Sequence, residues 1–270
     1  MVPPLPAGEA RQPAQRRMEH QRAQYPRLSC HHGNAAREND LEEAVRVADA
    51  FPEIDVFEID FLTHRRLLIS AHDYSERVIR RGSRLSSWLR ELVVKRGKTL
   101  WIDVKENLAL YFHWCHEHFD AQLLFECLEE ARAVDAAVVA RVWVGCQDET
   151  LREALIEYNA VQCAGRWTII LDMPMAPAYV AQFFAPECLR GALQESVCED
   201  FEHHQYERFD VISLDQSFFT SRKALKAFIR SLRLAPHVLV VLNSFARDQA
   251  PIRVDETRIV MQYDYVLGEK

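Results

Sequence analysis

Short apolar segments alternate with segments of helical period along most of this chain. The alternation predicts eight strands, at residues 27–31, 56–62, 99–104, 138–144, 167–171, 211–214, 238–242 and 259–263. Many of these runs are continuously apolar, which is typical of parallel strands that are buried on both faces. Eight such strands joined by helices close most simply into a (β/α)8 barrel. The sequence therefore predicts an α/β protein with the TIM-barrel architecture.

Six segments of helical period lie between these strands, at residues 40–50, 85–95, 108–133, 149–159, 178–185 and 221–232. Residues 1–25 are rich in Pro, Ala, Gln and Arg and have almost no large apolar side chains. Burial in this segment cannot offset the conformational entropy that ordering it would cost. We therefore expect a flexible tail at residues 1–25 and a single barrel domain at residues 26–270.

Charge and cysteine content limit the partners and the compartment. A net charge of −7 and a pI near 5.9 disfavour nucleic acid as a partner, because binders of polyanions carry a basic face. The chain has seven cysteines and no Cys-x-x-Cys pair, which favours a reducing compartment over a disulfide framework. No run approaches the roughly 18 apolar residues that a membrane span needs. We expect a cytoplasmic protein without a stable protein partner.

Acidic residues occur in two of the predicted strands. Glu58 and Asp60 are two residues apart among large apolar residues, so we expect them to share one face of their strand. Asp103 and Lys105 have the same spacing at the end of the next apolar run. Charged groups in apolar runs are costly unless they are paired or bound to a cation. The pattern indicates part of a metal site, with a solvated strand face as the alternative for Glu58 and Asp60.

Five short motifs follow one another along the chain. They are His31-His32-Gly33, Glu38-Asn39-Asp40, Glu58-Ile59-Asp60 with Leu62-Thr63, His72-Asp73, and Ile102-Asp103-Val104-Lys105. Their order and spacing resemble those of the glycerophosphodiester phosphodiesterase family. That family belongs to a group of phosphodiesterase barrels that also contains phosphatidylinositol-specific phospholipase C and sphingomyelinase D. The likeness extends over nearly all of the chain after residue 25, and it implies a barrel that cleaves phosphodiesters.

The resemblance implies a divalent metal cofactor. Glu58, Asp60 and Asp103 are the expected ligands, and an all-carboxylate set suits Mg²⁺ or Ca²⁺ better than Zn²⁺. Lys105 is expected to act in catalysis by stabilising the negative charge of the pentacovalent phosphorus. The sequence leaves the choice between Mg²⁺ and Ca²⁺ open.

The resemblance also implies catalysis by two histidines. His31 and His72 are expected to divide the roles of general base and general acid, because imidazole titrates near neutral pH. A buried structural histidine is the alternative for His31. His32, at the position of the family's arginine, and Asn243, just after a predicted strand, are expected to contact the substrate. A helix N-cap is the alternative for Asn243.

These residues predict a phosphoric diester hydrolase that acts on a small glycerophosphodiester or a lysophospholipid headgroup. The resemblance implies that a hydroxyl of the substrate's own alcohol attacks first and gives a cyclic phosphate, which water can then open. Asp103, at a position where the glycerophosphodiesterases usually have Glu, resembles the sphingomyelinase D branch. One alternative is thus a phospholipase D-type lyase that releases a cyclic phosphate. Another is a non-catalytic barrel that binds a phosphorylated ligand. Peripheral membrane contact through Phe183-Phe184 or Phe218-Phe219 stays open.

Overall fold

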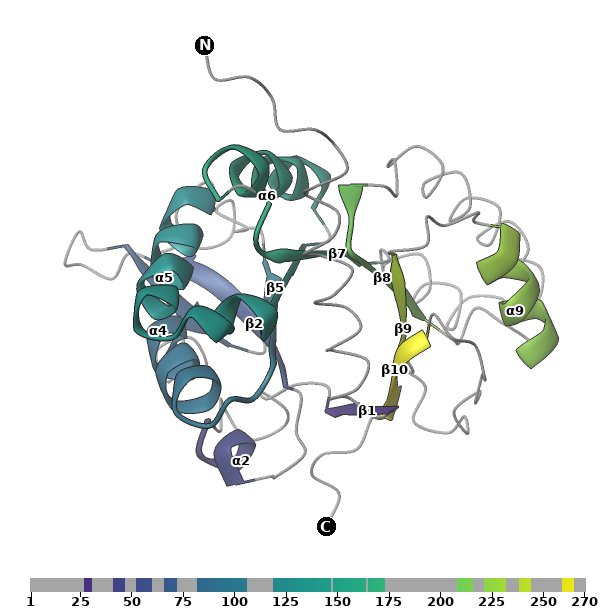
Figure 1. The fold of residues 1–270 in the computed structure, drawn as a ribbon, viewed down its shortest axis with the longest axis horizontal. Coiled ribbons are helices and arrows are strands. Elements are labelled where there is room, and N and C mark those ends of the chain that lie inside the picture. The colour runs from purple at the N-terminus through teal and green to yellow at the C-terminus, as the bar shows by residue number, and fades with distance from the viewer. Residues whose placement is uncertain are drawn as a thin grey trace.

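A computed structural model shows one mixed sheet with helices packed against it (Figure 1). It describes residues 27–30, 41–46, 52–59, 66–71, 82–105, 119–146, 148–163, 165–172, 208–215, 221–231, 238–243 and 259–264.

The sheet has ten strands in the order β1-β10-β9-β8-β7-β6-β5-β2-β3-β4. The bounds are β1 (Arg27–Cys30), β2 (Glu53–Ile59), β3 (Leu67–Ser70), β4 (Ser83–Arg84), β5 (Leu100–Val104), β6 (Val142–Cys146), β7 (Thr168–Asp172), β8 (Val211–Asp215), β9 (Leu239–Asn243) and β10 (Ile259–Asp264). The eight strands from β1 to β2 in this order are parallel. Strands β3 and β4 continue the sheet in antiparallel pairing. The expected α/β class with a mostly parallel sheet is confirmed.

The sheet is open in the described part of the chain. Closure into a barrel would require β1 to pair with β2, and no such pairing occurs between the described residues. Residues 56–59 of β2 pair instead with β3, on the side away from β5.

The helices connect the strands and cover the sheet. Their bounds are α2 (Leu41–Arg46), α4 (Leu85–Trp88), the π-helix η1 (Leu89–Val94), α5 (Ala121–Val134), the 3-10 helix η2 (Ala136–Ala140), α6 (Glu149–Val161) and α9 (Arg222–Ser231). Asp120 and Asp148 cap α5 and α6, since each carboxylate accepts hydrogen bonds from backbone N–H groups of the first turn. In Figure 1, α4 and α5 lie on the side of β2 and β5, and α9 lies beyond β8 and β9.

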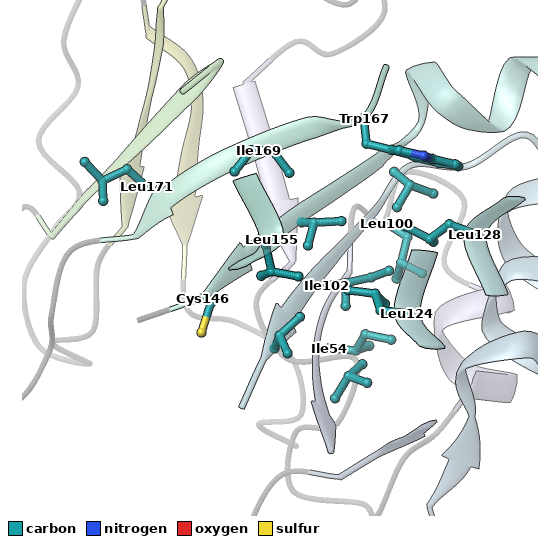
Figure 2. Packing of buried hydrophobic residues seen from close by; sticks show 14 of the residues in the cluster. Ile54, Leu100, Ile102, Leu124, Leu128, Cys146, Leu155, Trp167, Ile169 and Leu171 are labelled. Carbon is teal, nitrogen blue, oxygen red and sulfur yellow. The ribbon is translucent and has the colours of Figure 1, made fainter. Parts of the chain in front are cut away.

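The two faces of the sheet bury different sets of side chains. One face packs against the helices in a large apolar cluster, in which Leu124 of α5 lies against Ile54 and Ile102 (Figure 2). The opposite face carries a second cluster formed by Trp101, Trp143, Ile170, Val211, Leu239 and Val241. Since side chains alternate along a strand, Trp101 and Asp103 share this second face of β5.

The predicted strands and helices agree with the described elements in most places. The largest differences concern β2, which spans Glu53–Ile59 instead of 56–62, and the segment before β6, where residues 136–140 form η2. Strands β3 and β4 were not predicted. β3 is only four residues long and β4 only two, so neither carries the long apolar signal of a buried parallel strand.

Several expectations fall outside the described residues. They concern the tail at 1–25, the helix at 178–185, the first part of the helix at 108–133 and the two phenylalanine pairs. The described helices include none that is both long and apolar enough to cross a bilayer.

Candidate metal centre

Three buried carboxylates converge between β2 and β5. Glu53 and Asp55 come from β2, Asp103 comes from β5, and one oxygen of each lies within 4.8 Å of the others. Asp55 is paired directly with Asp103 in the parallel register, while Glu53 is opposite Trp101. All three residues are at most 5% exposed. The cluster could hold a metal ion.

Strand geometry explains why these three carboxylates meet. Ile54 and Val56 belong to the apolar cluster beneath the helices, so the alternating Glu53 and Asp55 lie on the other face of β2. Asp103 is on the same face of the sheet as Trp101. Direct pairing of neighbouring strands then brings Asp55 and Asp103 side by side.

Lys105 completes the cluster. Its Nζ lies 3.2 Å from Asp55 Oδ1 and donates a hydrogen bond to Asp103 Oδ2. The backbone N–H of Lys105 donates to the carbonyl of Val56 at 3.0 Å, which fixes the start of its side chain just after the end of β5. Burial alone would lower the pKa of Lys105, but the charges of Asp103, Asp55 and Glu53 outweigh it and raise that pKa well above its usual value. Lys105 is therefore an ammonium at neutral pH.

The chemistry of these donors fits a hard divalent cation. When ionised, the three carboxylates and the ammonium together carry a formal charge of minus two. Carboxylate oxygens are the ligands that Mg²⁺ and Ca²⁺ prefer, whereas Zn²⁺ sites usually include His or Cys. Glu53, Asp55 and Asp103 would be the ligands.

Glu58, an expected ligand, lies elsewhere. It is completely buried, its Oε1 accepts a hydrogen bond from Arg66 Nε, and its Oε2 accepts one from the backbone N–H of Asp120 at 2.6 Å. Arg66 also binds Asp120 Oδ2 at 2.6 Å. Glu58 thus connects β2 to the N-terminus of α5, and the structure does not bring it together with Asp103.

The physical reason is the position of β2. Glu58 is three residues after Asp55, and an odd separation along a strand puts two side chains on opposite faces. The strand expected at 56–62 would have ended beyond Asp60, with Glu58 near its carboxyl end. Because β2 instead spans 53–59, Asp55 is the residue opposite Asp103.

Of the remaining predicted site residues, the structure describes only Asn243. His31, His32, Asp60 and His72 lie outside the described residues. Asn243 is the last residue of β9, where it is opposite Asp215 of β8.

Sequence reasoning missed Glu53 and Asp55. The sequence does contain a signal for this pair. Glu53-Ile54-Asp55 has the same acidic-apolar-acidic pattern as Glu58-Ile59-Asp60, which follows five residues later. Only Glu58 and Asp60 match the motif of the family that the chain resembles, so the sequence predicted these two residues as ligands.

No model of a protein family matches the chain, and no curated protein matches it.

Proposed function

We propose that this chain is a metal-dependent phosphodiesterase that cleaves a small glycerophosphodiester or the headgroup of a lysophospholipid. The supporting observation is the buried cluster of Glu53, Asp55 and Asp103 with Lys105 just past the end of β5. Asp103 and Lys105 lie at the carboxyl end of β5, where α/β barrels carry their catalytic groups, whereas Glu53 and Asp55 lie in the first half of β2. A divalent cation held by these carboxylates, with the ammonium of Lys105 beside it, is suited to an anionic phosphodiester.

The proposal includes a closed (β/α)8 barrel at residues 26–270. Apart from the β3–β4 extension, the sheet order follows the chain from β2 and β5 through β10 and returns to β1. The two outermost strands of the parallel part of the sheet are therefore β1 and β2, which are also the first two strands in the chain. Pairing of β1 with β2 would close the barrel with the order from β5 to β10 unchanged, and it would use the part of β2 before Val56 or displace β3 from residues 56–59.

The carboxylates and Lys105 would have separate electrostatic roles, one in binding the cation and the other in stabilising the reacting phosphate. Glu53, Asp55 and Asp103 would hold Mg²⁺ or Ca²⁺, which when bound supplies Lewis-acid polarisation of a non-bridging phosphate oxygen. The ammonium of Lys105 would donate hydrogen bonds to the oxygens that gain charge as the phosphorus becomes pentacovalent.

His31 and His72 carry the proton transfers in this proposal. One imidazole takes the proton from a hydroxyl of the substrate's alcohol as that oxygen forms a bond to phosphorus. The bond to the leaving oxygen breaks, and the other imidazole gives that oxygen a proton. The product is a cyclic phosphate, which an activated water can open in a second step.

The experiment is an assay of purified protein against glycerophosphodiesters and lysophospholipids, with products followed by phosphorus NMR. We expect turnover with Mg²⁺ or Ca²⁺ and none after chelation. The His31→Ala variant should lose turnover and keep its affinity for the cation, whereas Asp103→Asn should lose both. Absence of turnover with either cation on the whole panel contradicts the proposal.

The same assay separates the alternative products. A cyclic phosphate that persists identifies a phospholipase D-type lyase, which the Asp103 and Lys105 pair in place of Glu and Lys favours. Binding of a phosphodiester without turnover identifies a non-catalytic barrel.

We further propose that the protein acts in the cytoplasm on small phosphodiesters or lysolipids, at most in peripheral contact with a membrane and without a nucleic-acid partner. The supporting observations are the net charge of −7 and the cysteine content. Cys127, Cys146 and Cys163 are free thiols, as a reducing compartment would keep them.

A further inference from the structure

Lys105 holds the same carboxylates that would bind the cation. Its Nζ contacts Asp103 Oδ2 and lies 3.2 Å from Asp55 Oδ1. Both aspartates belong to the three-carboxylate cluster. The ammonium therefore lies beside the position in which a divalent ion would be bound.

A divalent ion and this ammonium would compete for the cluster. Mg²⁺ and Ca²⁺ bind carboxylate oxygens at about 2.0 to 2.6 Å, so an ammonium on the same oxygens would lie within a few ångström of the ion. At that separation and in a buried site, repulsion between the two cations is strong. Binding of the ion would thus require Lys105 Nζ to withdraw.

The structure shows how Lys105 could withdraw without a change in the sheet. Its backbone is held by the hydrogen bond to Val56, while its side chain has a flexible four-carbon stem. The side chain is 26% exposed, whereas those of Asp55 and Asp103 are 6% and 2% exposed. Lys105 thus reaches the cluster from its more open side, and rotation of the stem can carry the ammonium away.

We infer that Lys105 is a built-in counter-ion, which neutralises part of the Glu53, Asp55 and Asp103 cluster in the metal-free protein and is displaced when a divalent cation binds. The displaced ammonium becomes available to an anionic oxygen of the substrate. This inference rests on the proposed metal site. It adds that cation binding and the availability of Lys105 are coupled.

Chemical labelling of the wild-type protein tests the coupling directly. The amine reagent sulfo-N-hydroxysuccinimide acetate is applied with and without Ca²⁺ or Mg²⁺, and acetylation of each lysine is quantified by peptide mass spectrometry. We expect the cation to accelerate acetylation of Lys105. Lys95 is the control, because it is half exposed and pairs with Glu91 at 2.7 Å on the surface, so its rate should stay constant.

Calorimetric titration with Ca²⁺ and Mg²⁺ supplies the second measurement. Lys105→Met removes the competing charge and should tighten cation binding by about tenfold or more, whereas Lys105→Arg should stay near wild type. The labelling experiment uses the wild-type protein, so it tests the displacement of Lys105 even if Lys105→Met fails to fold.

The outcomes separate the two claims. Faster labelling of Lys105 with bound cation supports the inference. Cation binding with an unchanged labelling rate overturns the inference and leaves the proposed function intact. Failure of the wild type to bind either cation, together with absence of turnover, overturns both.

Discussion

Asp55 lies directly opposite Asp103 in the parallel pairing of β2 with β5, and the ammonium of Lys105 contacts both carboxylates. The two aspartates belong to different strands and are 48 residues apart in the sequence, so only the sheet register brings them together. The candidate metal centre therefore depends on that register, and its ligands can be tested one at a time.

Cation affinity should depend on Asp55 and Asp103 and not on Glu58. Loss of an outer-shell partner typically weakens metal binding by roughly 10- to 100-fold, so loss of a direct ligand should weaken it at least that much. We expect this for Asp55→Asn and Asp103→Asn in calorimetric titrations with Ca²⁺ and Mg²⁺. Glu58→Gln should bind like the wild type. A loss in Glu58→Gln that matches the loss in Asp55→Asn would support the ligand set predicted from the sequence.

Glu58→Gln should reduce stability. The buried carboxylate accepts one bond from Arg66 and one from the backbone N–H of Asp120, and an amide can accept only through its single carbonyl oxygen. A buried donor that loses its acceptor costs about 1 to 3 kcal/mol. We expect the free energy of unfolding in urea to fall by this amount. The paired change Arg66→Gln should also destabilise the protein, because it removes the cationic partner of a carboxylate that is completely buried. Equal stability of Glu58→Gln and the wild type would contradict this structural role.

The sequence was sufficient for the α/β class and for the parallel strands of the described sheet, because long apolar runs and helical periods are local signals. Strand β5 and helix α6 were each predicted to within two residues. The α/β class follows from the repetition of such elements. Asp103 and Lys105 could be identified because they end one of the clearest runs, and the structure places them in the cluster.

The partners of Asp103 could not be predicted, because they depend on register. The stretch from Glu53 to Asp60 alternates acidic and apolar residues on both sides of Val56, so its pattern does not specify which acids face Asp103. A displacement by an odd number of residues exchanges the two faces. Long-range contacts, such as those of Glu58 with Arg66 and Asp120, also leave no periodic signal in the sequence.

The contribution of Glu91 to stability should disappear in acid. Hydrogen bonds from Lys95 and Arg90 lower the pKa of Glu91 to about 2 from its usual 4.5. A carboxylate with a lowered pKa stabilises the folded state above its unfolded pKa, and this stabilisation is lost as pH falls through the folded value. The difference in unfolding free energy between wild type and Glu91→Gln should therefore be constant above about pH 5 and vanish towards pH 2. Salt should reduce it, since the pair is on the surface. A difference that grows as the pH falls would contradict the assignment.

Cys127 should react slowly with alkylating reagents in the folded protein. Burial, with a smaller contribution from Glu130, raises the pKa of Cys127 to about 12. Because only the thiolate is nucleophilic, alkylation by iodoacetamide at pH 8 should be slower by roughly 100-fold or more than in urea. Peptide mass spectrometry after timed quenching measures the two rates. Similar rates in the folded and unfolded protein would show that the thiol is not protected.

Gly145→Ala should destabilise the protein by crowding Trp101. A Cβ at Gly145 would lie 3.2 Å from Trp101 Nε1 and 3.4 Å from Ile170 Cβ, on the face of the sheet that also carries the acidic cluster. Overpacking of a buried site typically costs about 1 to 3 kcal/mol. Replacement of a strand glycine by alanine gains only about 0.5 to 1 kcal/mol from lower chain entropy. We expect a net loss of unfolding free energy in urea.

The matched control for this prediction is Gly165→Ala. Gly165 has φ 64° and no atom within 4 Å of an added Cβ, so its cost arises from the backbone alone, about 1 to 2 kcal/mol. Both variants should be less stable than the wild type, but only Gly145→Ala should change the tryptophan fluorescence of the folded protein. Because Gly145 is paired with Asp103 in the register of β5 and β6, displacement of Trp101 should also weaken cation binding. Unchanged fluorescence and unchanged cation affinity in Gly145→Ala would show that the added methyl group does not displace Trp101.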